Sequence, residues 1–287
     1  MTRPRFGAHM SISGSPAMAL TRGQQVGCDA IQVFTRNANR WSSSPLSEQE
    51  AADFAAARTE TGIHPVVAHS SYLINLGSPD DTLWEKSADA AVTEMRRCQM
   101  LGISTYILHP GAHMGAGEEA GLARVVSGLD RALRATADTD VVITLEITAG
   151  QGSSLGHTFE QLAHMLNGSA FPGRLGICFD TAHALAAGYE FRQPETYAAM
   201  WAQFDALIGF IKLRAIHMND SKKDLGSHVD RHDQIGQGFV TLEAFQMIVN
   251  DSRLAQVPMI LETPKGPEML EDVQNLALLR SLLVASA

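Results

Sequence analysis

Histidines and carboxylates at the ends of short apolar runs are the residues of this 287-residue sequence that could do chemistry. The apolar run 175–179 leads directly to Asp180, and His183 follows three residues later. If a strand ends there and gives way to a loop, both side chains emerge at the same end of the sheet. One Asp-x-x-His pair is weak evidence for a site, and its two residues could serve two neighbouring ions.

The same arrangement recurs along the chain, and this recurrence makes it informative. Six apolar runs end in a residue type that binds metals: His69, His109, Glu146, Asp180, His217 and Glu262. A lone histidine at a strand end is more often an ordinary core or loop residue, but burying several unpaired carboxylates is costly. Cations offset that cost, and mixed imidazole and carboxylate ligands suit zinc or manganese better than calcium.

Three further candidate ligands, His183, Asp230 and His232, fall in segments expected to be loops. Side chains two residues apart in extended backbone point to the same side, so Asp230 and His232 can chelate one ion with His183 as a third ligand. Nine candidates exceed the needs of one or two tetrahedral ions. We therefore expect three clustered metal ions, with some carboxylates bridging.

Eight short apolar runs alternate with eight longer amphipathic segments, which indicates repeated strand–helix units. The expected strands are 6–9, 30–34, 65–69, 105–109, 141–146, 175–180, 215–219 and 258–262. The expected helices lie near 15–26, 47–60, 81–100, 118–135, 158–166, 195–211, 241–251 and 268–284. Runs that are apolar on both faces are typical of parallel strands covered by helices.

Eight such units favour an α/β fold in which one (β/α)8 TIM barrel spans residues 1–287, with its functional loops at the C-terminal strand face. All the candidate ligands would then line one mouth. A doubly wound open sheet is the alternative, although no Gly-x-Gly-x-x-Gly turn follows the first run. We find no linker or internal repeat that would divide the chain.

Composition limits the class of protein. No apolar run is long enough to cross a membrane, and no apolar signal segment opens the chain. The three cysteines, Cys28, Cys98 and Cys178, are far apart in apolar stretches, which is typical of reduced core thiols in a cytoplasmic protein. The net charge of −9 argues mildly against a polyanion partner, but bound divalent cations would offset much of it. We expect a monomer.

Seven motifs carry a resemblance to a known family. In order, they are Phe6-Gly7-Ala8-His9, Ser71-Tyr72-Leu73-Ile74-Asn75-Leu76-Gly77, His109-Pro110-Gly111, Leu145-Glu146-Ile147-Thr148-Ala149-Gly150-Gln151-Gly152, Phe179-Asp180-Thr181-Ala182-His183, His217-Met218-Asn219-Asp220-Ser221-Lys222 and Val229-Asp230-Arg231-His232. Together they resemble endonuclease IV, the zinc-dependent abasic-site endonuclease family of DNA repair. The resemblance extends from about residue 5 to residue 265.

The resemblance implies a deoxyribonuclease that cuts duplex DNA 5′ to abasic sites and trims blocked 3′ ends. It also implies three zinc ions, with manganese as an alternative at one or more sites. The first would be held by His69, His109 and Glu146, the second by Glu146, Asp180, His217 and Glu262, and the third by His183, Asp230 and His232. Glu146 would be the catalytic residue, placing the metal pair and orienting a hydroxide shared between them.

The resemblance further implies that Tyr72 and Leu73 enter the DNA stack, where a missing base makes nucleotide extrusion cheapest. The loop after the second expected strand is polar, basic and aromatic, as in minor-groove insertion, and offers Arg36, Asn39 and Arg40. Asn39 stands where an arginine wedge is often found, and Arg40 follows it. Either side chain could fill the gap that the flipped nucleotide leaves.

Lys222 and Arg231 share loops with candidate ligands, so we expect them to contact backbone phosphates. An adjacent lysine pair such as Lys222-Lys223 is, however, more often simply solvated.

Two other functions fit parts of the pattern. A sugar isomerase or epimerase of the xylose isomerase type shares the barrel and a carboxylate–histidine metal site, but it would need a smaller, oxygen-rich, two-ion site. A metal-binding protein without catalysis would need closed coordination shells. Nine ligands and the Tyr72 and Arg40 loops favour the nuclease.

Overall fold

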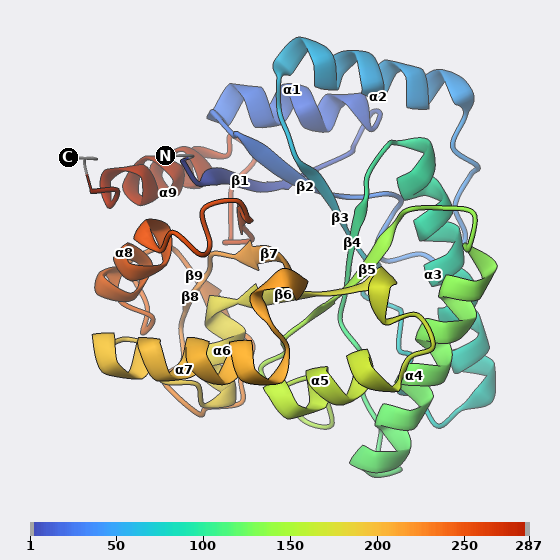
Figure 1. Cartoon of the computed structure of the whole chain (residues 1–287). Helices are drawn as coiled ribbons and strands as arrows, with labels where there is room; N and C mark the ends of the chain where they lie inside the picture. Colours follow the sequence, from blue (N-terminus) through green and yellow to red (C-terminus); the bar gives the residue numbers. More distant parts are fainter. Residues whose placement is uncertain (1–2, 285–287) are drawn as a thin grey trace.

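The computed structural model describes residues 3–284, and eight parallel strands in it close into a barrel (Figure 1). The barrel strands are β1 (Arg5–Met10), β2 (Ala30–Phe34), β3 (Val66–His69), β4 (Thr105–Leu108), β5 (Val142–Glu146), β6 (Leu175–Asp180), β7 (Leu213–His217) and β10 (Pro258–Leu261). Each strand pairs with its sequence neighbour among these eight, and β10 closes the ring against β1. The predicted (β/α)8 TIM barrel is confirmed, and the open-sheet alternative is wrong.

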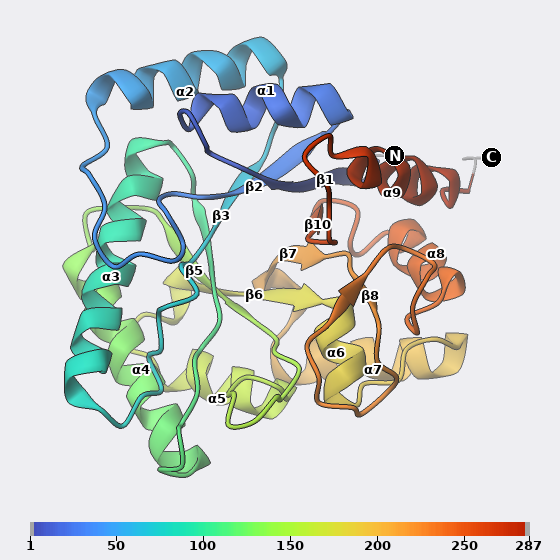
Figure 2. The same cartoon turned by 180° about the vertical axis from the view of Figure 1, so that it is seen from behind.

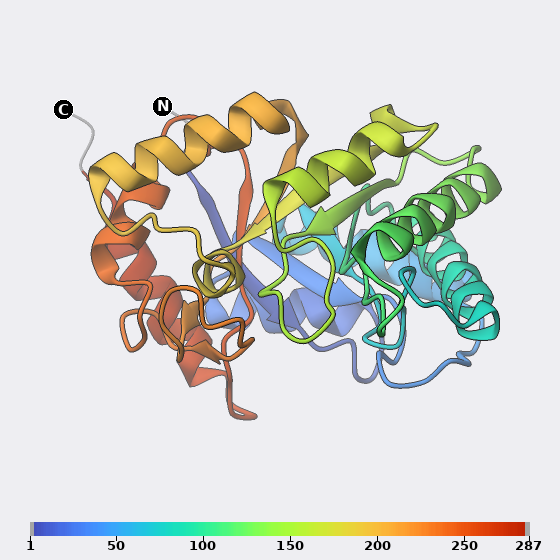
Figure 3. The same ribbon diagram turned by 90° about the horizontal axis from the view of Figure 1, so that it is seen from below.

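Helices cover the outside of the strands (Figure 3). They are α1 (Ala17–Val26), α2 (Glu48–Thr61), α3 (Asp81–Met100), α4 (Glu118–Ala135), α5 (Phe159–Gly168), α6 (Thr181–Ala187), α7 (Pro194–Leu207), α8 (Leu242–Asn250) and α9 (Leu270–Ser281), with short 3₁₀ turns at Pro172–Arg174 and Phe210–Lys212. Every expected strand and helix is present, with small differences at the ends. Within residues 3–284, no helix combines the length and the apolar character that crossing a membrane requires.

A small apolar cluster sits beneath the mouth of the barrel, apart from the main core between strands and helices. Its members are Ala30, Val67, Ile107, Cys178, Ala215 and Ile260. Each lies two positions before a polar residue that is in its strand or directly follows it, and residues two apart in a strand point to the same side. The strand-end residues therefore form the next inward-facing layer, above an apolar floor.

The segment after β6 differs from the expected loop, because helix α6 begins directly at Thr181. The carboxylate of Asp180 accepts the backbone N–H of His183 (2.8 Å) and so caps this helix. Both residues remain at the barrel mouth, but a buried helix rather than a loop carries His183.

The long connection after β7 folds back on itself through a second element that the sequence did not predict. The short strands β8 (Asp220–Ser221) and β9 (His232–Asp233) pair antiparallel. The carboxylate of Asp220 also accepts the backbone N–H groups of Gly236, Gly238 and Val240. These contacts return residues 230–232 to the barrel mouth.

Two of the sequence motifs, Ser71–Gly77 and His109–Gly111, lie in loops that hydrogen bonds join to each other. The amide oxygen of Asn75, in the loop after β3, accepts the backbone N–H of Ala112 (2.8 Å), and its amide nitrogen donates to the carbonyl of Ala112 (3.1 Å). A Cβ atom on Gly111 would lie only 2.2 Å from that amide oxygen, which explains the glycine in His109-Pro110-Gly111. The loops after β3 and β4 are thus fastened together.

Candidate metal centre

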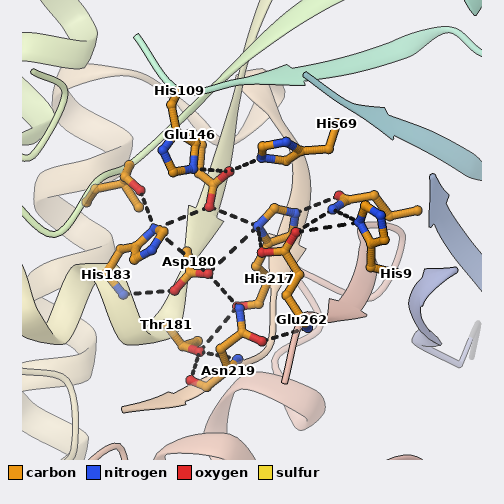
Figure 4. Close-up of polar contacts among 12 residues, drawn as sticks. His9, His69, His109, Glu146, Asp180, Thr181, His183, His217, Asn219 and Glu262 are labelled. Atoms are coloured by element: carbon orange, nitrogen blue, oxygen red, sulfur yellow. Dashed lines mark hydrogen bonds and ion pairs between the residues drawn. The ribbon is translucent and has the colours of Figure 1, made fainter. Parts of the chain in front are cut away.

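All the predicted ligands meet at the C-terminal mouth of the barrel, and Figure 4 labels those other than Asp230 and His232. They are His69, His109, Glu146, Asp180, His183, His217, Asp230, His232 and Glu262. Six of them end barrel strands or directly follow one, the seventh lies on α6, and the last two come from the connection that β8 and β9 fold back. The structure therefore brings together residues that are up to 193 positions apart, as the barrel prediction required.

Glu146 is fully buried at the centre of the cluster, with imidazoles on both sides of its carboxylate. One oxygen lies 3.1 Å from the Nε2 atoms of both His69 and His109. The other oxygen lies 2.9 Å from Nδ1 of His217 and 3.2 Å from Nδ1 of His183. The two oxygens thus face two different groups of donor atoms.

A second group forms around the Nδ1 atom of His217. This nitrogen is 3.2 Å from an oxygen of Glu262 and 3.7 Å from an oxygen of Asp180. Together with Glu146, these residues offer ligand atoms within 4.8 Å of one another. The first group, His69, His109 and Glu146, meets the same limit.

The third group lies between α6 and β9. The Nε2 atoms of His183 and His232 are 3.3 Å apart, and an oxygen of Asp230 is 3.3 Å from the first and 3.5 Å from the second. An oxygen of Asp180 is also 3.7 Å from Nε2 of His232. Asp180 therefore borders both the second and the third group.

The hydrogen bonds of four histidines show that the cluster suits cations. Nδ1 of His69, His183 and His232 lies 2.9–3.2 Å from the carbonyl oxygens of Ser70, Ile147 and Glu262, respectively. Nε2 of His217 lies 2.8 Å from the amide oxygen of Gln32. When the ring nitrogen named here carries the proton and donates it, the other ring nitrogen is an unprotonated acceptor among other acceptor atoms of the cluster. Metal-bound histidines usually have this arrangement.

The pKa shifts of Glu146 and His183 reflect the close packing of carboxylates and imidazoles in the cluster. Burial would raise the pKa of Glu146, but the imidazoles of His217 and His109 outweigh it and hold the pKa well below its usual range. Burial would lower the pKa of His183, but Asp180 and the neighbouring carboxylates raise it well above its usual range. In the metal-free protein, protons on imidazoles therefore balance the carboxylates that cations would otherwise balance.

Comparisons with known proteins agree with this geometry. The sequence pattern of xylose isomerase-like TIM barrels matches residues 20–282. A protein from Chloroflexus aggregans, named probable endonuclease 4, is 52% identical over 284 residues, 99% of each chain. The chain belongs to the endonuclease IV family. It is accordingly a hydrolase and a nuclease, as the sequence resemblance implied.

Solved structures distinguish proteins that share the family from proteins that share only the fold. Endonuclease IV from Thermus thermophilus superposes with a TM-score of 0.86 at 35% identity, over 97% of this chain and 98% of that one. A D-tagatose 3-epimerase-like protein reaches a TM-score of 0.73 at only 18% identity, over 97% of this chain and 96% of its own. The second likeness shows the fold alone, so the sugar isomerase alternative is not favoured.

Two amide side chains that the sequence analysis missed hold ligands of this endonuclease IV centre in place. Gln32, in the middle of β2, joins His217 to an oxygen of Glu262 and also lies 3.0 Å from Nδ1 of His9. Asn219 donates to Asp180 (2.7 Å) and accepts the backbone N–H of Glu262 (2.7 Å). Gln32 stands two residues after Ala30 of the apolar floor, but it lies inside β2 rather than at its end, so the strand-end pattern did not identify it.

His9 sits beside this layer and does not titrate near neutral pH. Its burial lowers its pKa to about 3, although the nearby carboxylate of Glu262 opposes the shift. A neutral His9 therefore faces Gln32 and Glu262, as expected for a residue that orients ligands.

An open cavity of about 360 Å³ lies over the centre and is bordered by Tyr72 and Lys265 as well as by ligand residues. A second cavity of about 230 Å³ shares His109, His183 and Asp230 with it and reaches Arg231. Substrate can therefore approach the ligand groups from the solvent at the barrel mouth.

Most of the residues predicted to contact DNA lie on the rim of this mouth. Tyr72 is 70% exposed, and its ring meets that of Phe34 edge-on at 5.3 Å. Asn39, Arg40, Lys222 and Arg231 are also exposed, and Leu73 is half-buried.

Arg36 was predicted to contact DNA, and the structure contradicts this. Its side chain is buried, where its Nε donates to the carboxylate of Glu94 (2.6 Å) and its Nη1 donates to the carbonyls of Arg40 (2.6 Å) and Trp41 (2.9 Å). Arg36 therefore supports its loop from within, and only 3% of its surface is exposed.

Proposed function

We propose that this endonuclease IV family member is a DNA-repair enzyme that hydrolyses the phosphodiester bond 5′ to abasic sites in duplex DNA. The same centre would trim blocked 3′ ends, since both reactions cleave a phosphate ester beside a sugar. The observation that carries the proposal is the set of three overlapping ligand groups at one solvent-open mouth. Membership in the endonuclease IV family supports the same reaction class.

Three Zn²⁺ ions, or Mn²⁺ at one or more positions, fit the donors. The first group would be His69, His109 and Glu146, the second Glu146, Asp180, His217 and Glu262, and the third His183, Asp230 and His232, with Asp180 at its border. Bound divalent cations supply positive charge to the phosphate oxygens and lower the pKa of bound water to about 7.

The protein's own residues fix the spacing of these groups. Glu146 belongs to two of them at once, so its carboxylate sets how far apart they lie. Asn219 fixes the position of Asp180 relative to Glu262, because it forms a hydrogen bond with each of them. The apolar layer beneath keeps all these side chains at the barrel mouth, where charge would build on a reacting phosphate.

Exposed side chains on the rim would bind the duplex. Tyr72, supported by Phe34, and the neighbouring Leu73 would enter the base stack, and Asn39 or Arg40 would fill the space of an extruded nucleotide. Lys222 and Arg231 would contact phosphates. We also propose that the protein acts as a monomer in the cytoplasm, in keeping with its three buried, unpaired cysteines.

The direct test is incision of a duplex that carries one abasic-site analogue, with an intact duplex of the same sequence as the control. Chelated protein should be inactive, and activity should return as Zn²⁺ is added back, reaching a maximum near three ions per chain. The product should carry a 3′ hydroxyl at the 5′ side of the lesion. Equal cutting of both duplexes, or aldose turnover without incision, would refute the proposal.

A further inference from the structure

A buried carboxylate outside the metal centre joins the two loops proposed to enter DNA. Glu94 lies on α3 and is 1% exposed, and none of its hydrogen bonds reaches a metal-ligand candidate. Burial raises its pKa, while Arg36 and the other donors around it oppose this shift. A carboxylate buried at such cost is retained only where several donors satisfy it, so its partners reveal what it holds.

One oxygen of Glu94 holds the loop after β2. It accepts the Nε–H of Arg36 (2.6 Å), and Arg36 in turn donates to the backbone carbonyls of Arg40 and Trp41. Arg97, one turn along α3, donates to the carbonyls of Thr35 (2.6 Å) and Ser44 (2.9 Å) in the same loop. Figure 2 shows this loop running beside α3.

The other oxygen of Glu94 holds the loop after β3. It accepts the backbone N–H of Ser71 (3.1 Å), the residue directly before Tyr72, and the hydroxyl of Tyr106 (2.7 Å) from β4. The hydroxyl of Ser71 then donates to the carbonyl of Ala38 (2.6 Å), so the two loops also touch each other beside this carboxylate.

We propose that Glu94 is a positioning residue that fixes the loop of Asn39 and Arg40 relative to the loop of Tyr72, so that both enter one lesion together. This inference rests on the proposed function, because it assigns the loops to DNA. Each oxygen of Glu94 serves a different loop, so neither loop can move far without breaking a contact to a shared, rigid helix. The ligand groups contact neither oxygen, and the inference therefore concerns substrate binding rather than chemistry.

The substitution Glu94→Gln tests this because one amide cannot replace both oxygens. If its NH₂ group faces Arg36, two donors oppose each other, and if it faces Ser71, the backbone N–H loses its acceptor. Tyr106→Phe is the matched control, since it removes a hydrogen bond to the same carboxylate while leaving both loop contacts. Arg97→Ala is a second comparison that loosens only the loop after β2.

Three readouts separate positioning from general damage: hydrogen exchange, incision of abasic duplex, and hydrolysis of bis(p-nitrophenyl) phosphate, a small diester that needs the metals but not the loops. In Glu94→Gln, exchange should rise in both 35–44 and 70–76. KM for abasic duplex should rise roughly 10-fold, as for loss of well-placed base stacking, with kcat within about twofold. Small-diester turnover and metal content should not change.

Each control has its own expected pattern. Arg97→Ala should raise exchange in 35–44 alone, and Tyr106→Phe should change neither segment. Faster exchange in only one loop of Glu94→Gln, or an unchanged KM, overturns the inference. Equal losses on the small diester and on DNA also overturn it, because Glu94 would then support the whole fold. If wild-type protein does not incise abasic DNA, the proposed function fails, whereas the exchange pattern still decides whether Glu94 couples the loops.

Discussion

The metal centre and the rim loops lie at the same end of the barrel, but they are built in opposite ways. In the centre, inward-facing strand-end residues stand on an apolar floor, and Glu146, Asp180 and His217 are fully buried. On the rim, Tyr72 and Arg40 project into solvent from loops. The centre is thus built from buried side chains that hold one another, whereas the rim presents exposed side chains to a large partner.

The difference also shows in what holds each region. Ligand side chains are held by other side chains of the barrel mouth, Gln32 from β2 and Asn219 from the segment after β7. The rim loops are held through their backbones by α3, with Glu94 and Arg97 as the main anchors. The chain can therefore change exposed rim residues, such as Asn39, without disturbing the chemistry beneath them.

Glu146→Gln should have the largest effect on activity. It removes a charge shared by two ligand groups and turns one acceptor into a donor facing imidazole. We expect kcat/KM for abasic duplex to fall by more than about 100-fold, since residues that only orient metal ligands are already worth 10–100-fold. Metal content, measured alongside incision, should fall as well. Glu60→Gln, on the exposed face of α2, is the control, and a Glu146 variant with near-normal turnover would remove the residue from the mechanism.

Arg36 and Arg40 offer a sharper comparison within one loop. Arg36→Ala leaves Glu94 buried without its cation and should lower the free energy of unfolding by about 3–5 kcal/mol. Arg40→Ala removes an exposed side chain and should change that free energy by less than about 0.5 kcal/mol, while raising KM for DNA. Urea unfolding of both variants measures the contrast. Equal destabilisation by the two changes would contradict the assignment of Arg36 as the internal support.

The sequence was sufficient for the barrel and for the ligand residues because both follow strong local rules. Apolar runs of strand length ending in His, Asp or Glu identify the strand and its mouth-facing residue together. Helix α6 escaped prediction because it has only seven residues and follows a carboxylate expected to act as a ligand. Asp180 is both a candidate ligand and the N-cap of α6, and only its role as a ligand was recognised from the sequence.

The internal supports could not be read from the sequence, because nothing local identifies a partner. Glu94 is 58 positions from Arg36, and the pair forms only when α3 packs beside the loop after β2. Arg36 and Arg40 look alike in a basic, aromatic loop, yet one is buried and the other exposed. Gln32 was missed because glutamine is not a typical metal ligand and because it lies inside β2 rather than at its end.

Removal of the metals should reverse the sign with which the unfolding temperature changes as pH rises above neutrality. In the metal-free protein, Asp180 and nearby carboxylates raise the pKa of His183 against burial, and Cys178 with Glu146 and Glu262 does so for His217. A raised histidine pKa stabilises the fold below the unfolded value of about 6.5, and this stability is lost as pH rises through the folded pKa. The lowered pKa values of Glu146 and Glu262 add stability that is lost as pH falls below about 4.5.

Chelated protein should therefore unfold at its highest temperature between about pH 4.5 and 6.5, and at a temperature lower by at least about 2 °C at pH 8.5. Metal-loaded protein should become more stable over the same rise, because cations compete with protons for the ligands. Calorimetric scans of both forms in matched buffers measure the two slopes. Parallel slopes would mean that the histidines of the cluster do not exchange protons for cations.

Lys222→Ala should have the smallest effect, confined to the rim. The backbone of Lys222 is fixed by pairing with Arg231 (2.9 Å), while its side chain is exposed, so its loss should leave folding and metal content unchanged. If the side chain contacts one phosphate, the slope of log affinity against log salt should become shallower by about 0.9. Arg96→Ala is the matched control, because Arg96 pairs with Asp138 away from the mouth. A slope that changes equally in both variants would assign the effect to net charge rather than to the rim.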